Sequence, residues 1–303
     1  MTSYAVLGPG GVGGFVAGAL SRAGEDVTVV AREETAELIN REGISVDSVV
    51  LGDFTAHPTA VSELRDPVDV LFVATKATTL EASLERVTAP PGLVVPLLNG
   101  LDHLGLLRQR FGAGAVAASV IRIESDRPAP GRIVQTSPSV RVDMASEHPT
   151  PACRLPAVAQ ALIGAGIAAE VREREADVMW AKLVRLNALA ATTSVSGREI
   201  GFIRSDPQWR QTLVACIEEG AAAAVADGAR IDASGPLAEL DGAHPSLGSS
   251  MQRDLAAGRV PELDAIQGAV IRAAARHGLP CPTVTRLAGE IARMAGIDPP
   301  AAG

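Results

Sequence analysis

Three glycines stand close to the start of the chain with the spacing Gly-x-Gly-x-x-Gly, at Gly8, Gly10 and Gly13. Glycines so spaced give a tight turn, let backbone approach a ligand closely, and let the next helix pack on its strand. The first N–H groups of that helix then face an anion. We therefore predict that the loop binds the diphosphate of a dinucleotide, although a plain structural turn is the alternative. The loop residues are Gly8, Pro9, Gly10, Gly11, Val12 and Gly13.

The second predicted strand, residues 27–31, ends in Arg32. Dinucleotide sites for NAD usually carry Asp or Glu here, because a carboxylate accepts a hydrogen bond from the ribose 2′-hydroxyl. A carboxylate would repel a 2′-phosphate, whereas a guanidinium pairs with it. Arg32 therefore favours NADP(H). An ordinary exposed arginine is the alternative, and the acidic residues Glu33 and Glu34 that follow would weaken the preference.

The second half of the chain holds a lysine in an apolar helical stretch, at Lys182. Its stem could lie along apolar neighbours while the ammonium group reaches solvent. If it instead faces a ligand, it can donate a proton to a carbonyl oxygen while hydride reaches the carbon. The same residue therefore fits either a surface role or a catalytic one.

Two further positions are candidates at predicted helix starts. Ser249 and Gln252 have capping-box spacing, and Ser250 adds a second hydroxyl. Such a start also suits a carboxylate ligand. Glu262 precedes the last long helix that the pattern predicts, where the helix dipole alone would favour it.

The elements that must position these residues change in character along the chain. Up to about residue 172, strands alternate with helices, which predicts a parallel sheet. Strands at 68–73 and 93–98 lead to Lys76 and Asn99, and residues past the carboxyl ends of parallel strands face the ligand. Residues 132–135 and 140–142 are predicted to form a hairpin that extends this sheet, and residues 151–171 a helix and a strand.

Alanine-rich helical segments replace the alternation from about residue 173. Asp206-Pro207 is a helix start and Gly228 a helix stop. Further helices are predicted at 249–257 and 263–277. The fold class is therefore α/β, with an N-terminal Rossmann-type dinucleotide-binding domain over residues 1–172 and an all-helical C-terminal domain for substrate and dimerisation over residues 173–303.

Composition narrows the classes of function. The 303 residues are 47% hydrophobic and carry a net charge of -8 without a basic block, so binding to nucleic acid or to a membrane surface is not expected. The chain enters a strand at once, no uncharged run resembles a membrane span, and its three cysteines are scattered. We therefore expect a cytoplasmic protein with reduced thiols. No spacing of Cys and His suggests a metal site.

Taken in order, these features resemble the ketopantoate reductase (2-dehydropantoate 2-reductase) family over nearly the whole chain. The resemblance implies that Lys182 is the proton donor and that Asn99 contacts both nicotinamide ribose and substrate. It implies that Ser250 holds the substrate carboxylate, that Glu262 bonds cofactor or substrate hydroxyls, and that Ile123 offers backbone contacts to the cofactor. The residues that carry it are Gly8, Gly10, Gly13, Arg32, Lys76, Asn99-Gly100, Trp180-Ala181-Lys182, Ser249-Ser250-Met251 and Glu262.

The chain departs from the family one and two turns after Lys182. The family has asparagines four and eight residues after its lysine, on one helix face, whereas this chain has Leu186 and Ala190. The nearby Asn187 points about 100° away from that face on a regular helix. A one-residue π-bulge would bring Asn187 back to the face, and without one the substrate wall is apolar.

The sequence thus predicts an enzyme that uses NADPH to reduce a 2-keto acid to a 2-hydroxy acid, with 2-dehydropantoate the first candidate substrate. One alternative is the same reaction on a less polar keto acid, because an apolar wall discriminates hydroxyls poorly. Another is an NADP(H)-sensing protein without turnover. A homodimer is a further expectation, since apolar residues after Leu213 would suit either a dimer face or a core.

Overall fold

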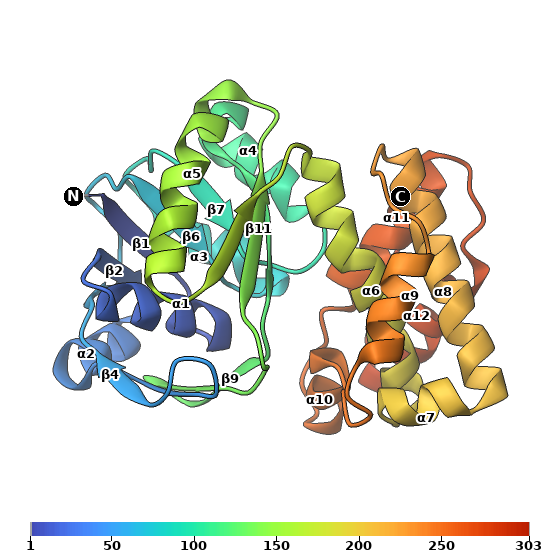
Figure 1. Ribbon diagram of the computed structural model, residues 1–303. Helices are drawn as coiled ribbons and strands as arrows, with labels where there is room; N and C mark the ends of the chain where they lie inside the picture. Colours follow the sequence, from blue (N-terminus) through green and yellow to red (C-terminus); the bar gives the residue numbers. More distant parts are fainter. Residues whose placement is uncertain (1, 303) are drawn as a thin grey trace. The chain divides into compact units, whose positions relative to one another are not determined.

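The first part of the chain builds a five-stranded parallel sheet (Figure 1). The computed structural model describes residues 2–302. The strands lie in the order β5-β2-β1-β6-β7, and every neighbouring pair is parallel. This order confirms the predicted Rossmann-type sheet, with β1 at its centre. The strands are β1 (Ser3–Leu7), β2 (Asp26–Val30), β5 (Thr59–Val61), β6 (Val70–Val73) and β7 (Val94–Pro96).

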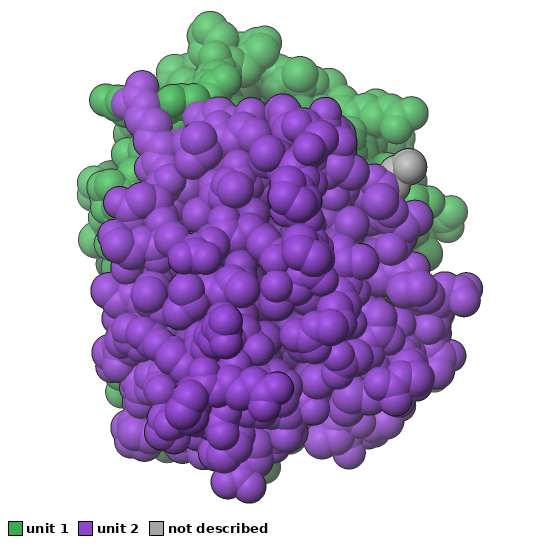
Figure 2. Space-filling view, turned by 90° about the vertical axis from the view of Figure 1, so that its right-hand side faces the viewer, with its two compact units in different colours: residues 1–98, 103–178 green, residues 99–102, 179–303 purple. Residues whose placement is uncertain are grey.

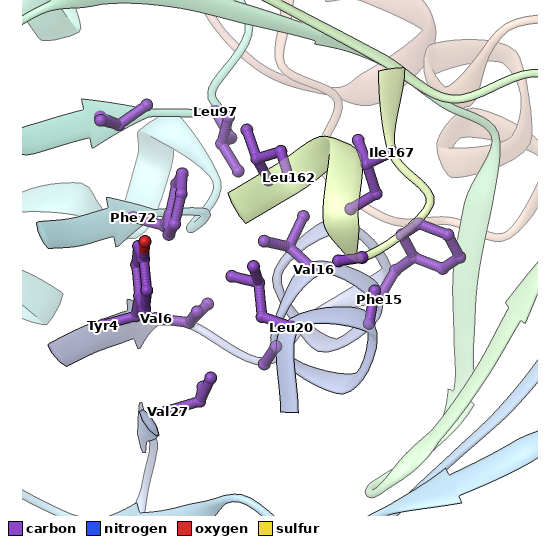
Figure 3. Packing of buried hydrophobic residues seen from close by; sticks show 14 of the residues in the cluster. Tyr4, Val6, Phe15, Val16, Leu20, Val27, Phe72, Leu97, Leu162 and Ile167 are labelled. Atoms are coloured by element: carbon purple, nitrogen blue, oxygen red, sulfur yellow. The ribbon is translucent and has the colours of Figure 1, made fainter. Parts of the chain in front are cut away.

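Apolar side chains cover both faces of this sheet, because alternate residues of a strand point to opposite sides. Tyr4 and Val6 of β1 face the cluster in Figure 3, which includes residues of the helices α1 (Gly11–Arg22) and α5 (Pro149–Gly164). Leu7 faces the opposite cluster, formed with α3 and α4. The other helical segments of this part are α2 (Glu33–Glu42), η1 (Ala77–Thr79), α3 (Leu80–Leu84), α4 (His103–Phe111) and η2 (Ala113–Ala115).

Two smaller sheets accompany the parallel sheet. One has the order β4-β3-β10-β9 and the other β12-β11-β8. The predicted helix and strand within residues 151–171 are confirmed by α5 and β12. The strands are β3 (Ile44–Ser48), β4 (Phe54–Ala56), β8 (Ala118–Arg122), β9 (Ser125–Ala129), β10 (Arg132–Gln135), β11 (Arg141–Ala145) and β12 (Ala168–Val171).

The predicted hairpin of residues 132–135 and 140–142 is wrong. β10 pairs with β9 and β3, whereas β11 pairs with β8 and β12, so the two segments lie in different sheets. The hairpin forms one step earlier, between β9 and β10, where Gly131 has a φ of +73°. Glycine adopts this conformation without strain, which makes it suited to the turn.

The chain divides into two compact units, coloured separately in Figure 2. Unit 1 comprises residues 1–98 and 103–178, and unit 2 comprises residues 99–102 and 179–303. The chain passes from one to the other inside helix α6 (Glu175–Ser196), between Val178 and Met179. The short segment Asn99–Asp102, which follows β7 at a distance of three residues in sequence, belongs to unit 2.

The regular elements of unit 2 are all helical, with no strand in residues 179–302 or in the segment Asn99–Asp102, which is a turn. The predicted cap at Asp206 is confirmed, since its carboxylate accepts from the N–H groups of Gln208 and Trp209 at 3.0 and 2.9 Å. Besides α6, the elements are α7 (Ile200–Ser205), α8 (Pro207–Ala226), α9 (Ser234–Gly242), α10 (Ser250–Ala256), a π-helical turn η3 (Asp264–Gly268), α11 (Ala269–Arg276) and α12 (Pro282–Ala295).

Helix α12 was not predicted, and it changes the place of Glu262 in the fold. Glu262 stands before the π-helical turn and α11, so another long helix follows the one it precedes. The carboxylate of Glu219 caps α12 by accepting from the N–H groups of Thr283 and Val284, each at 2.9 Å. In unit 2, Leu213 is fully buried within the chain itself.

Within residues 2–302, no helix is long and apolar enough to cross a membrane. The cysteines are unpaired: burial raises the pKa of the Cys216 thiol far above its ordinary value and that of Cys281 to about 12. Both thiols therefore stay protonated at neutral pH and are poor nucleophiles.

Candidate active site

The glycine loop has the geometry that a diphosphate site requires. Gly8 has a φ of +90°, which favours glycine, and a Cβ on Gly13 would lie 2.2 Å from the carbonyl oxygen of Gly8. A Cβ on Gly10, in contrast, would meet no atom within 4 Å. Two of the glycines thus close the turn against α1, and the middle one leaves open space beside the backbone. Gly10 is also the N-cap of α1, and no side chain caps that helix start.

The carboxyl ends of three strands meet around this loop. The N–H of Gly8 donates to the carbonyl of Val30 at the end of β2, and the N–H of Ala74 after β6 donates to the carbonyl of Leu7. Arg32 and Lys76 follow these strand ends, and both are exposed. Arg32 is the N-cap of α2, whose first turn carries Glu33 and Glu34.

The segment after β8 lies against the same loop. Ser125 Oγ donates to the carbonyl of Gly11 at 2.9 Å, and a Cβ on Gly11 would lie 2.4 Å from the carbonyl oxygen of Ser125. This contact brings Ile123, two residues earlier and partly buried, to the neighbourhood of the glycine loop.

Thr75 is a residue that the sequence analysis missed. It follows β6, its Cγ2 would lie 2.8 Å from a Cβ on Gly8, and its buried Oγ1 has no hydrogen-bond partner among residues 2–302. Buried hydroxyls normally have a partner, so we expect a water molecule or a ligand of the loop to supply one here. Its place directly before Lys76 was the only signal in the sequence.

Three side chains of unit 2 meet through hydrogen bonds. Lys182 Nζ donates to Asn99 Oδ1 at 2.7 Å, and Asn99 Nδ2 donates to Glu262 Oε2 at 3.0 Å. Lys182 and Glu262 lie 83 and 163 positions from Asn99 in sequence, yet both hydrogen-bond its side chain. The two bonds also set the amide orientation, because only its oxygen can accept from an ammonium group and only its nitrogen can donate to a carboxylate.

A glycine allows Asn99 to reach this place. Gly100 has a φ of +84°, and a Cβ there would lie 2.1 Å from the carbonyl oxygen of Ala265. Ala265 belongs to the π-helical turn that begins two residues after Glu262. The close approach of the two backbones therefore brings Asn99 beside Glu262, and no residue with a side chain would fit without a shift.

Helix α6 supplies Lys182 from a partly buried position. Its neighbours Trp180 and Leu183 are each 2% exposed, and they anchor the helix in the core of unit 2. The Lys182 ammonium group is directed to Asn99, so the interpretation that it only reaches into solvent is not needed.

The two predicted serines have different surroundings. Ser249 is buried: its hydroxyl accepts from the N–H of Gln252 at 3.0 Å and bonds Thr193 Oγ1 of α6 at 2.9 Å. Ser250, the first residue of α10, is exposed, and its hydroxyl bonds no residue in the range 2–302. The structure thus gives Ser249 a structural contact and leaves Ser250 accessible.

The face of α6 after Lys182 differs from the family pattern in the way the sequence suggested. Leu186 is partly buried and Ala190 is fully buried. Residues 175–196 are α-helical throughout, so the π-bulge that would turn Asn187 towards Lys182 is absent from α6. Asn187 is instead fully buried, and its Nδ2 donates to the carbonyl of Cys216 on α8.

Comparison with known proteins identifies the family. The family model described as Ketopantoate reductase PanE/ApbA matches residues 4–146, and the model described as Ketopantoate reductase PanE/ApbA C terminal matches residues 176–295. The chain belongs to the ketopantoate reductase family. The resemblance predicted from the ordered motifs is therefore confirmed, and the protein is an oxidoreductase of a family that uses NAD(P)H.

Individual relatives align with most of the chain. It is similar to the 2-dehydropantoate 2-reductase of Caulobacter vibrioides, with 30% identity over 293 residues, 93% of this chain and 95% of that protein. The 2-dehydropantoate 2-reductase of Mycobacterium tuberculosis (strain H37Rv) is 30% identical over 291 residues, 93% of this chain and 94% of that protein. These ketopantoate reductases align along nearly their full length with this chain.

A solved structure shows the same fold. D-mandelate dehydrogenase with NADH and anilino(oxo)acetate has a TM-score of 0.89 over 97% of this chain and 99% of that chain, at 18% identity. At this identity the likeness concerns the fold alone. That enzyme and the 2-dehydropantoate 2-reductases share an architecture but differ in the acid named for each.

Proposed function

We propose that the protein uses NADPH to reduce a 2-keto acid to a 2-hydroxy acid, and that 2-dehydropantoate is its first candidate substrate. The observation that carries this proposal is the hydrogen-bonded set of Lys182, Asn99 and Glu262. A cationic donor held by two polar partners suits protonation of a carbonyl oxygen.

The residues of unit 1 fit the cofactor, which supplies the hydride. The open space at Gly10 and the uncapped N–H groups of α1 suit its diphosphate. Arg32 would pair with the 2′-phosphate, and the unpartnered Thr75 hydroxyl adds a hydrogen bond near Gly8. The proposed cofactor contacts are Gly8, Pro9, Gly10, Gly11, Val12, Gly13, Arg32, Thr75, Lys76, Asn99, Ile123 and Glu262.

Lys182 would complete the chemistry at the keto group. As hydride reaches the keto carbon, the oxygen gains a pair of electrons and takes a proton from Lys182 Nζ, which becomes a neutral amine. Asn99 holds that nitrogen in place through its 2.7 Å bond. Solvent returns the proton to Lys182 after the hydroxy acid leaves. An ammonium group can perform these steps because its charge also polarises the carbonyl beforehand.

The exposed hydroxyl of Ser250 would hold the substrate carboxylate. Ser249 would fix the start of α10 beside Ser250, because its hydroxyl bonds the N–H of Gln252 and the hydroxyl of Thr193 on α6. We propose that residues 1–172 supply most of the cofactor contacts and residues 173–303 most of the substrate contacts, with Asn99 serving both ligands.

A second candidate function is the same reaction on a keto acid with a less polar tail. The observation that favours it is Leu186, which stands partly exposed one turn after Lys182 while Asn187 is buried. A site with a hydrogen-bonding group rejects a substrate that lacks the matching hydroxyl strongly, whereas an apolar site does not.

Steady-state oxidation of NADPH, followed by absorbance, would test both candidates. We expect turnover of 2-dehydropantoate, and a kcat/KM at least about 100-fold above that for 2-ketoisovalerate, which lacks the hydroxyl, would mean that the site hydrogen-bonds this hydroxyl. Equal values or a reversed preference would favour the less polar substrate. Leu186→Asn, which restores the amide of the family, should then shift the ratio towards 2-dehydropantoate. Absence of turnover with every 2-keto acid tried would contradict the proposed function.

A further inference from the structure

The segment that carries Asn99 is tied to the segment after Glu262 by more than one contact. Gly100 packs against the backbone of Ala265, and the same turn ends in Asp102. Neither segment alone fixes the distance between the Asn99 amide and the Glu262 carboxylate. The contacts that join the two segments therefore decide whether the hydrogen bond between these side chains forms.

Arg272 of α11 bridges the two segments. Its Nη2 donates to Asp102 Oδ2 at 2.6 Å, and its Nη1 donates to Asp264 Oδ1 at 2.7 Å. Nη2 also donates to the backbone carbonyl of Asp264 at 3.0 Å. A planar guanidinium with several donors can hold two carboxylates at once, which an ammonium group does less well.

The absence of a side chain at Gly268 leaves room for the ion pair between Arg272 and Asp264. A Cβ on Gly268 would lie 2.7 Å from Asp264 Oδ1 and 3.0 Å from Arg272 Nη1. Glycine in the π-helical turn therefore allows the guanidinium and the carboxylate to sit over the backbone. The π-helical turn itself is the kind of irregularity that often occurs beside functional sites.

The same turn is joined to α6 on its other side. Gln267 is fully buried, and its Nε2 donates to the backbone carbonyl of Asn187 at 3.2 Å. Asn187 stands five residues after Lys182 on α6. The π-helical turn thus links the three segments that carry Asn99, Lys182 and Glu262, through Arg272 on one side and Gln267 on the other.

The exposure of the charged groups limits what this bridge adds to stability. The side chains of Asp102 and Asp264 are 49% and 72% exposed, and that of Arg272 is 22% exposed. Although Arg272 is mostly buried, both of its carboxylate partners are exposed, and ion pairs to exposed groups contribute little to the free energy of unfolding. Their effect on the position of a catalytic group can be larger, because small displacements change rates steeply.

We propose that Arg272 is a positioning residue, which holds the Asn99–Asp102 turn against the π-helical turn and so sets Asn99 between Lys182 and Glu262. This inference rests on the proposed function, since it assigns Arg272 a role in that same site. Arg272 forms no hydrogen bond with Asn99, Lys182 or Glu262. It acts on them through its bonds to Asp102 and Asp264.

The test compares Arg272→Met with Arg276→Met, which removes the next arginine of α11 and its pairing with Asp227. We expect Arg272→Met to lower kcat roughly 10- to 100-fold at nearly unchanged Tm, because misplacement near 1 Å can cost about 100-fold. Arg276→Met should keep the wild-type kcat. Arg272→Lys should recover part of the loss, since it retains the charge but not the fork of donors.

A double-mutant cycle separates positioning from a general structural role. If Arg272 acts through Asn99, Arg272→Met should cost less than about threefold in an Asn99→Ala background. An equal loss in both backgrounds, or wild-type kcat in Arg272→Met, would overturn the proposal.

A second readout does not depend on turnover. Hydrogen exchange of the Asn99 side-chain amide, assigned in NMR spectra by its loss in Asn99→Ala, should become faster in Arg272→Met and stay slow in Arg276→Met. Unchanged slow exchange in Arg272→Met would overturn the inference. If the wild-type protein reduces no keto acid, the proposed function fails, and this measurement still decides the role of Arg272.

Discussion

The glycine loop of unit 1 and the Lys182 cluster of unit 2 are built in opposite ways. The loop is one continuous segment, and it depends on side chains that are absent: a Cβ on Gly13 would collide with the Gly8 carbonyl. The cluster depends on side chains that are present, brought from positions 99, 182 and 262. The first site is therefore sensitive to any added atom, and the second to any displacement of its three segments.

Lys182→Ala should have the largest effect and break the second site alone. We expect kcat to fall about 10²- to 10⁴-fold, the usual contribution of a general acid, while NADPH binding in unit 1 stays within a few-fold. Stopped-flow kinetics and fluorescence titration with NADPH would measure the two quantities.

Lys182→Arg is the matched variant for that experiment. It keeps the positive charge but cannot release a proton at ordinary pH, so its kcat should stay low as well. Wild-type turnover in either variant would remove Lys182 from the role of proton donor.

Gly10→Ala and Gly13→Ala should separate cofactor binding from folding within the loop. Gly10 has extended backbone angles and faces open space, so Gly10→Ala should leave Tm unchanged. It should weaken NADPH binding by at least about tenfold, or 1.4 kcal/mol, because the Cβ enters the space proposed for the diphosphate. Gly13→Ala should lower Tm, since its Cβ collides with backbone. Calorimetry and NADPH titration would measure both.

Gly105→Ala provides the control for these two variants. Gly105 lies in α4 of the same unit and a Cβ there meets no atom within 4 Å. This variant should not lower Tm, and it should leave the affinity for NADPH unchanged. If Gly10→Ala binds NADPH like the wild type, the diphosphate does not approach Gly10.

Arg32→Gln tests whether a side chain of unit 1 also contributes to cofactor binding, which otherwise depends on the backbone of the glycine loop. Loss of a charge-assisted hydrogen bond costs about 1.5–3 kcal/mol, so the Kd for NADPH should rise roughly 10- to 100-fold. The Kd for NADH, which has no 2′-phosphate, should not change. An equal rise for both cofactors would indicate a structural role for Arg32.

Ser250→Ala and Ser249→Ala should show the smallest effects. The first should affect substrate binding and the second the stability of unit 2. Ser250→Ala should raise KM for the keto acid about tenfold through loss of a hydrogen bond to a carboxylate, at constant Tm. Ser249→Ala should lower the free energy of unfolding by about 1 kcal/mol, because it removes a helix cap. The reverse pattern would exchange the roles of the two serines.

The same contrast explains what the sequence could predict. The glycine loop, the strand ends at Arg32, Lys76 and Asn99, and the cap at Asp206 follow from local patterns. The meeting of Asn99 with Glu262 depends on Gly100 passing Ala265, a long-range contact that no local spacing encodes. Arg272 could be predicted only as one more charged residue on a helix.

The error in the strand pairing has a similar origin. β10 and β11 each have the alternation of a strand, but pairing partners are chosen in three dimensions, and Gly131 directs β10 to β9 instead. Asn187 is a related case, because a regular α6 buries its amide against Cys216 on α8. Both outcomes depend on packing against elements that are distant in sequence.

Transfer of deuterium from NADPH labelled at C4 of the nicotinamide tests the central claim most directly. With 2-dehydropantoate present and both C4 hydrogens of the cofactor replaced by deuterium, each NADPH oxidised should yield one 2-hydroxy acid that carries deuterium at C2, detected by mass spectrometry and NMR. The Lys182→Ala protein should form this product far more slowly. Oxidation of NADPH without deuterium at C2 would contradict the account, as would the absence of any hydroxy acid product.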